Sequence, residues 1–295
     1  MMRKFKLKCR IITPLFMGGA NQQAELRTQS INGVIRWWFR VLGGSFEDEK
    51  RLFGWGGKGA NQGLVRMSLC NFDNSNPNNC LLAGKNGEGI KYLGFSLIMQ
   101  NRSCIDIDTT FDLIIRFHPK ATDEDIKKFF SALWCAFNLG NFGSRSRRGF
   151  GSIMVEEVEG ELPEGFQLEF KPNRPDKWIK QNLRTIEGLI CWKPREDIPY
   201  VFKFEIYKVN KNALSNLNRW VNLVQRGRRG RYRGLTNWEK LIDFMGFLLM
   251  AFRSYRNPDY LKAKNILQGM RLQDLTFERP IFGLPLNFYF WGRTY

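Results

Sequence analysis

The chain has 295 residues, of which 43% are hydrophobic and 14% aromatic, enough apolar material for two domain cores. Its 46 Lys and Arg residues against 28 Asp and Glu give a formal net charge of +18, which favours a polyanionic partner over a small neutral ligand. Nucleic acid is the first candidate partner and an anionic membrane surface the second. No apolar run reaches the roughly 18 residues of a membrane span, and the N-terminus lacks the apolar core of a signal peptide. We therefore expect a cytoplasmic protein with no membrane partner.

The first two predicted elements are a strand and an amphipathic helix. Residues 4–11 alternate apolar and basic side chains, which predicts a strand with one core face and one basic face. The basic face is equally compatible with a solvated surface and with a polyanion site. Ser30 is the predicted N-cap of a helix that Gly43 ends. Trp37 and Phe39 flank the apolar stripe of this helix, and we assign both to packing.

Further strands are predicted near residues 64–72, 111–117 and 153–158, with a second helix between the last two. Thr122 caps this helix, and its apolar residues keep helical spacing up to Phe137. The order strand, helix, strand, strand, helix, strand is that of a ferredoxin-like domain.

The second half repeats this order less clearly. We predict a strand at residues 200–209, a helix near 214–224, a long helix that a Thr236 and Glu239 capping box begins, and an edge segment at 280–286. The predicted fold class is α+β, with two ferredoxin-like (RRM-like, split βαβ) domains in tandem and loop insertions. We expect domain 1 at residues 1–160 and domain 2 at residues 161–295.

A glycine- and arginine-rich loop at residues 140–152 separates the second helix from the last strand of the first half. Its four glycines allow positive φ and close approach to a ligand, and Gly143 and Gly149 are the candidates for that role. Arg145, Arg147 and Arg148 add planar cations that fit phosphate oxygens. The pattern predicts a loop that grips a phosphodiester backbone, and the alternative is a flexible, solvated surface loop. It is not a P-loop, because it follows a helix and leads into a strand.

A second glycine-rich stretch, residues 53–59, links the first helix to the second strand. Trp55 on this stretch has the chemistry to stack on a base and Lys58 the charge to contact a phosphate.

Several motifs together resemble a known family. The stretches on which the resemblance rests are residues 12–20, 25–27, 30–33 and 36–40, the loop at 140–152 and the segment 280–286. They are similar to the first subunit of the type III-B CRISPR effector, the Cmr complex, a family of the RAMP superfamily. The resemblance implies two ferredoxin-like domains, the second incomplete as given, and a non-catalytic antiviral subunit near the 3′ part of the guide. It also implies CRISPR RNA, target RNA and other RAMP subunits as partners. Matched residue by residue, it implies RNA contacts by Arg27, Arg36, Arg40, Arg145, Arg147 and Arg148.

Catalytic residues are not expected. The single histidine, His118, has no second histidine nearby to complete an acid and base pair for RNA cleavage. Asp106, Asp108 and Asp112 alternate along a strand, a pattern more typical of solvent-facing acids than of a metal site. We therefore predict no metal, no cofactor and no enzyme activity. Two alternatives stay open: a stand-alone RAMP-type endoribonuclease that cleaves CRISPR RNA, and a basic RNA-binding protein of ribosomal type.

Overall fold

The computed structural model describes residues 3–21, 23–72, 87–170, 174–189, 237–254, 289–290 and 293–294. It divides the chain into two compact units, one made of Met1–Gly84 with Gly94–Lys208 and the other of Lys85–Leu93 with Val209–Tyr295. The strand predicted at 200–209, the helix near 214–224 and the edge segment at 280–286 lie outside the described residues.

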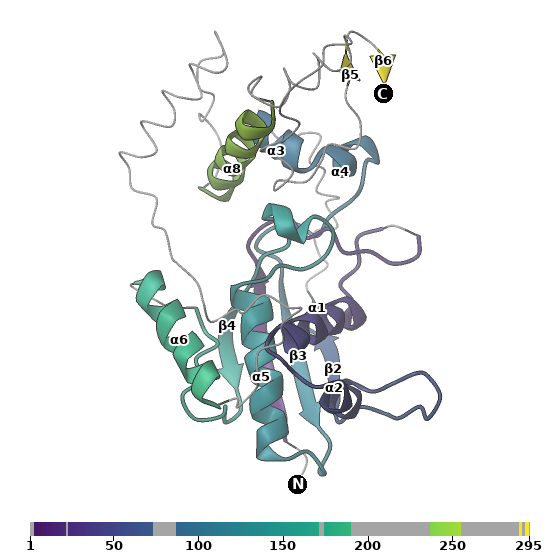
Figure 1. Cartoon of the computed structure of the whole chain (residues 1–295), viewed down its shortest axis with the longest axis vertical. Coiled ribbons are helices and arrows are strands. Elements are labelled where there is room, and N and C mark those ends of the chain that lie inside the picture. The colour runs from purple at the N-terminus through teal and green to yellow at the C-terminus, as the bar shows by residue number, and fades with distance from the viewer. Residues whose placement is uncertain are drawn as a thin grey trace, which may run out of the picture. The chain divides into compact units, whose positions relative to one another are not determined.

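The first unit is built on a four-stranded antiparallel sheet of order β2-β3-β1-β4 (Figure 1). Its strands are β1 (Lys4–Ile11), β2 (Val65–Cys70), β3 (Thr110–Phe117) and β4 (Ile153–Glu159). β1 pairs along its length with β3 on one side and β4 on the other, with a bulge between Lys8 and Cys9 in the β4 pairing. This strand order and connectivity are those of a split βαβ unit. The mixed α+β class and the element order predicted for the first half are therefore confirmed.

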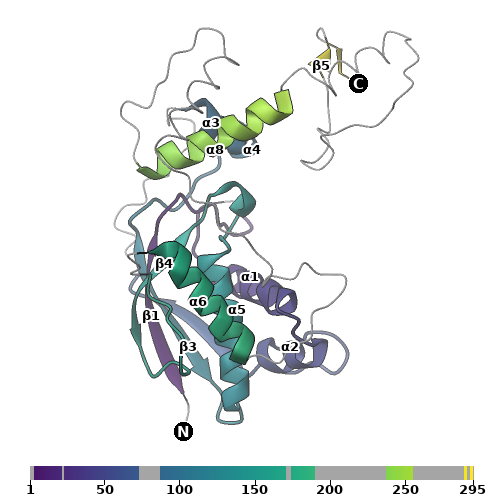
Figure 2. The same ribbon diagram turned by 60° about the vertical axis from the view of Figure 1, so that its left-hand side comes forward.

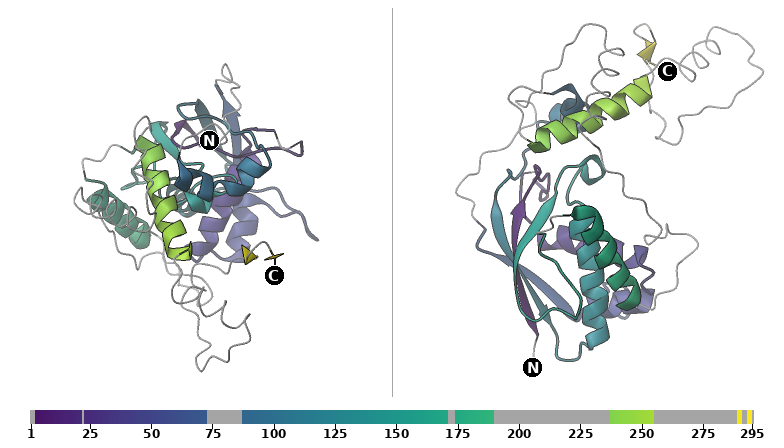
Figure 3. Two further views of the ribbon diagram at one scale, coloured as in Figure 1. Left: turned by 90° about the horizontal axis from the view of Figure 1, so that it is seen from above. Right: turned by 90° about the vertical axis from the view of Figure 1, so that its left-hand side faces the viewer.

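Three helices cover one face of this sheet, as Figures 2 and 3 show: α1 (Thr28–Val41), α5 (Asp123–Asn138) and α6 (Pro175–Leu189). The alternate residues Phe5, Leu7 and Cys9 of β1 are buried beneath them, as the alternation predicted. α5 is buried along most of its length, and α6 packs on it through Trp134 and Trp178, whose ring centroids are 5.5 Å apart. The sequence pattern had left α6 unassigned.

Capping residues explain where the helices begin. Thr122 and Asp125 form a reciprocal capping box at the start of α5, so that prediction is confirmed. The Ser30 cap is wrong, because the N-cap position of α1 is three residues earlier, at an extended Arg27 that provides no side-chain cap. Ser45 caps the short helix α2 (Phe46–Phe53) by accepting a hydrogen bond from the Asp48 N–H.

The remaining described elements are short or belong to the second unit. α4 (Phe95–Met99) lies in the first unit. In the second unit, the Asp243 carboxylate of α8 (Asn237–Ser254) accepts hydrogen bonds from the N–H groups of Gly89 and Ile90 in α3 (Glu88–Leu93). β5 (Tyr289–Phe290) and β6 (Arg293–Thr294) pair with each other. Among the helices that the structure describes, none combines the length and the hydrophobicity that a membrane crossing demands.

Candidate nucleic-acid interface

The glycine- and arginine-rich loop at residues 140–152 is anchored at several points. The N–H of Phe142 donates to the Gly151 carbonyl at 2.9 Å, and the N–H of Ser144 donates to the Phe16 carbonyl at 2.7 Å. Phe142 and Phe150 are fully buried and fix the loop from the inside. Much of the loop's backbone hydrogen bonding therefore serves its own anchoring, and the loop is a built element of the fold rather than a loose connection.

Three glycines of the loop have a positive φ, which non-glycine residues rarely adopt: Gly143 (78°), Gly149 (86°) and Gly151 (76°). A Cβ on Gly143 would lie 2.6 Å from the Phe16 carbonyl oxygen, and one on Gly151 would overlap the carbonyl oxygen of Phe142. Gly143 and Gly149 thus shape the loop, and their approach to RNA stays a prediction. Gly151 was not among the predicted site residues, although its neighbours in the motif were.

The three loop arginines differ in their surroundings. Arg145 has a left-handed backbone (φ 60°), and its Nε donates to the Ser96 Oγ of α4 at 3.0 Å. Arg147 is exposed and Arg148 is half-buried. Within the described part of the chain, no carboxylate forms an ion pair with Arg145, Arg147 or Arg148. Their charge is therefore open to an external anion.

Arg36 and Arg40 of α1, in contrast, both form ion pairs with one carboxylate of the protein. Arg36 Nη2 lies 2.8 Å from Glu49 Oε1, and Arg40 Nε lies 3.1 Å from Glu49 Oε2. The Glu49 carboxylate comes from α2 and is buried. Burial makes such a pairing a requirement of the fold, because an unpartnered buried carboxylate is costly. One carboxylate offsets one of the two positive charges, and Arg40 is the more exposed of the pair.

Arg27 stands immediately before α1. Its Nη1 donates to the Gly18 carbonyl at 3.4 Å, and its Nε lies 4.0 Å from a Glu25 carboxylate oxygen. These weak contacts leave the side chain partly exposed.

Trp55 and Lys58 belong to a different end of the first unit. They follow α2, which is tied to the first turns of α5 by the 3.0 Å ion pair between Asp48 and Lys128. The glycine- and arginine-rich loop follows the opposite end of α5, a helix of about 24 Å. Trp55 meets the Phe46 ring edge-on at 5.1 Å, and Lys58 is exposed. The structure therefore does not bring this stretch and the loop into one site.

Three of the basic residues of β1 are paired with acids of the neighbouring strand β4. Lys6 pairs with Glu159 at 2.6 Å, Lys8 with Glu157 at 3.3 Å and Arg10 with Glu156 at 2.5 Å. The hydrogen bond that Lys6 donates to Glu159 raises the pKa of Lys6, and the one that Arg10 donates to Glu156 raises the pKa of Arg10. RRM domains stack bases on aromatic side chains of their open sheet face. The outward-facing positions of β1–β4 carry no aromatic residue, so the solvated reading of this face is favoured.

A groove of about 520 Å³ lies between α1 and the loop. Its α1 side is formed by Ser30, Gly33, Val34 and Trp37, and its loop side by residues that include Asn141 and Arg147. Phe39 is fully buried, which confirms its assignment to packing, whereas Trp37 is 47% exposed and its ring packs edge-on against Trp38.

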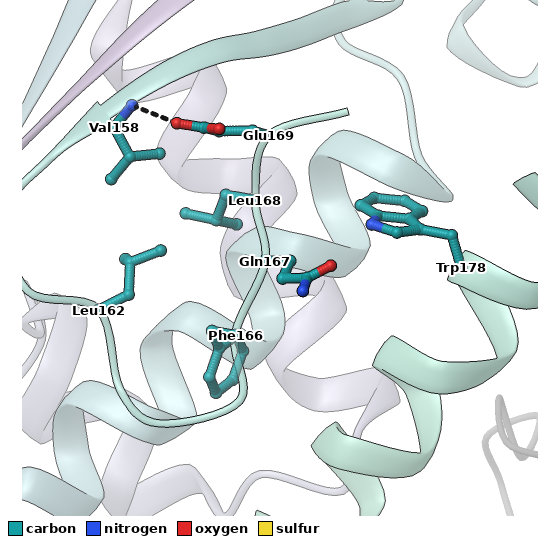
Figure 4. A pocket seen from close by; sticks show the side chains of 7 residues that line it. All are labelled: Val158, Leu162, Phe166, Gln167, Leu168, Glu169 and Trp178. Atoms are coloured by element: carbon teal, nitrogen blue, oxygen red, sulfur yellow. Dashed lines mark hydrogen bonds between the residues drawn. The ribbon is translucent and has the colours of Figure 1, made fainter. Parts of the chain in front are cut away.

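A second hollow, of about 330 Å³, lies between β4, the segment after it and α6 (Figure 4). Its lining is largely apolar and includes Leu162, Phe166, Leu168 and Trp178. Its described lining contains no Lys or Arg, so these residues offer no basic side chain to a phosphate.

The residues considered for catalysis do not converge. His118 is exposed, and its Nδ1 accepts a hydrogen bond from the Lys120 N–H at 3.2 Å. Asp108 and Asp112 pair with Arg10 and Lys6, whereas Asp106 accepts from the N–H of Ile107. Over the described ranges, no three His, Cys, Asp or Glu side chains are grouped as a metal ion would require.

Comparison of the sequence with known proteins identifies the relatives of this chain. The family model of the RAMP superfamily matches residues 8–154. The chain is 33% identical over 171 residues to the CRISPR system Cmr subunit Cmr1-2 of Pyrococcus furiosus, covering 49% of this chain and 91% of that protein. It is 26% identical over 197 residues to Cmr1-1 of the same organism, covering 62% of this chain and 56% of that one.

The fold is also similar to that of a solved structure. The crystal structure of apo Cmr1 from Pyrococcus furiosus matches with a TM-score of 0.58 at 20% identity, over 94% of this chain and 79% of that chain. The chain belongs to the RAMP superfamily and, within it, to the family of Cmr1 subunits of CRISPR systems.

Proposed function

We propose that this chain is a non-catalytic, RNA-binding subunit of a cytoplasmic, CRISPR-RNA-guided type III-B (Cmr) effector complex. The relatives' names as Cmr subunits support its assembly with other RAMP subunits. In this proposal the loop at 140–152 holds the phosphodiester backbone of guide or target RNA, with the 3′ part of the guide as the expected contact. The remainder of the chain forms a second ferredoxin-like domain.

The observation that carries this proposal is the contrast between two sets of basic residues. Arg10, Arg36 and Lys6 are each held by a carboxylate of the protein. Arg147 and Arg148 project from an anchored loop and have no acid partner among the described residues. Guanidinium groups that are carried by an anchored backbone and not neutralised are suited to charge-assisted hydrogen bonds with phosphate oxygens.

The test is a triple variant, Arg145→Ala with Arg147→Ala and Arg148→Ala, titrated with single-stranded RNA. We expect binding at least about tenfold weaker, a loss of about 1.4 kcal/mol. Because each neutralised phosphate contributes a log–log salt slope of roughly −0.7, the slope should become less negative by up to about 2. The melting temperature should stay near that of the parent, because the buried phenylalanines of the loop are untouched.

A matched control removes three positive charges elsewhere. Lys177, Lys180 and Arg184 are exposed along α6, so their change to Ala alters the net charge equally. RNA affinity that falls as far in this control as in the loop variant would show a general charge effect and defeat the clamp. Unchanged affinity in the loop variant would defeat it as well.

A further inference from the structure

We propose that the groove between α1 and the loop is a base slot, which holds one nucleobase of a single-stranded RNA against the ring of Trp37 while an adjoining phosphate lies at Arg147. This inference rests on the proposed function, because it names the part of an RNA chain that this site accepts.

The placement of Trp37 is the first step. Ser30, Gly33, Val34 and Trp37 follow one another at helical spacing and line the groove together. Trp38, which is buried, meets the Trp37 ring edge-on at 5.1 Å and 85°, and so braces it. A braced aromatic ring that stays 47% exposed offers a stacking surface, and base stacking on such a ring tolerates any base.

The second step is Gly33. A Cβ at this position would meet nothing within 4 Å, and the backbone is ordinary helix, so neither packing nor φ requires a glycine. Glycine in a helix interior nevertheless lowers helix stability relative to alanine. What Gly33 provides is open space beside Trp37, on the floor of the groove.

The third step is the chemistry of the opposite wall. Arg147 lines the groove and has no acid partner within the described residues, which suits a phosphate better than an aliphatic side chain of a protein partner. The Asn141 amide is already engaged, since it donates to the Ser146 carbonyl at 3.0 Å and accepts from Ser152 Oγ at 2.8 Å. Because this amide has no obvious freedom to read a base edge, we expect little base preference.

The experiment compares two oligonucleotides of equal length and charge on the full chain: a short single-stranded oligoadenylate and the same backbone with abasic ribose at each position. The parent should bind the base-bearing oligonucleotide at least about fivefold more tightly, the gain expected from stacking one base. Trp37→Ala should abolish this gain and leave abasic affinity unchanged. Arg147→Ala should weaken both oligonucleotides alike.

Gly33→Leu fills the slot and leaves every other side chain in place, so it should also abolish the base-dependent gain. Gly188→Leu on α6 is its matched control, because a Cβ there also meets nothing within 4 Å, and it should behave like the parent. If the parent binds both oligonucleotides equally, or if both Trp37→Ala and Gly33→Leu keep the gain, the slot is overturned and the clamp stands. If the parent binds neither, the slot and the proposed function fall together.

Discussion

Ion pairing separates arginines that are alike in the sequence. Arg36, Arg40 and Arg147 all match positions where the family resemblance implies RNA contact, yet the first two share the buried carboxylate of Glu49 and the third has open surroundings. The acid that makes this difference lies on α2, a helix that the sequence pattern did not predict. A pattern of charge within one helix cannot reveal a partner supplied by another.

Arg36→Ala should therefore act on stability before it acts on binding. Removing this side chain leaves the buried Glu49 with Arg40 alone, and we expect a loss of about 1–3 kcal/mol in the free energy of unfolding. Arg40→Ala removes the more exposed partner and should cost less than about 1 kcal/mol. Denaturant unfolding of the two variants measures both values. An Arg36→Ala protein that unfolds like the parent but binds RNA poorly would contradict this assignment.

At the scale of elements, the sequence pattern predicted structure that is determined within one stretch of the chain. It missed contacts that depend on residues far apart in the sequence. The capping box and apolar stripe of α5 lie within one stretch of sequence, and that helix is where it was predicted. The pairing of Lys6 and Arg10 with acids of β4 joins residues about 150 positions apart, so no local pattern announced it. The groove beside Trp37 is likewise formed by α1 together with the distant loop, so no pattern within α1 predicted it.

The glycines of the loop and of α1 should respond in opposite directions to alanine. Gly143→Ala and Gly151→Ala combine a positive φ with a Cβ that meets a backbone carbonyl, so each should cost at least about 2 kcal/mol. Gly149→Ala should cost about 1–2 kcal/mol from its positive φ alone, and Gly149→Val more, with weaker RNA binding. Gly33→Ala should stabilise α1 by up to about 1 kcal/mol. Thermal melts rank the four positions, and a loop glycine that tolerates alanine without loss would show that the loop can relax.

For the whole molecule, the excess positive charge is distributed unevenly. On the open face of the sheet, acids of β4 pair with Lys6, Lys8 and Arg10 of β1. The loop that follows α5, in contrast, has arginines without an acid partner within the described residues. Net charge alone predicted a polyanionic partner but not the surface that meets it. The tertiary fold determines which basic side chains are paired with acidic ones, and so which surface keeps its positive charge.

Incubation with single-stranded RNA, with or without divalent metal, should leave the RNA intact. RNA cleavage of this type needs a base for the 2′-hydroxyl and an acid for the leaving oxygen. Among the described side chains, none forms a hydrogen bond with His118 that would complete such an acid and base pair. Gel analysis of end-labelled RNA over time is the measurement. Cleavage that survives stringent purification and disappears in His118→Ala would favour the endoribonuclease alternative.

The central place of β1 in the sheet has a consequence for biosynthesis. Both of its hydrogen-bonding edges are completed by strands that come much later, at residues 110–116 and 153–159. At translation rates of about 5–20 residues per second, β4 leaves the ribosome roughly 8–30 s after β1. During that interval the apolar side of β1, with Phe5, Leu7 and Cys9, has no finished sheet to join. We therefore expect the nascent first unit to need protection by chaperones, or transient helix contacts, until its last strand has been made.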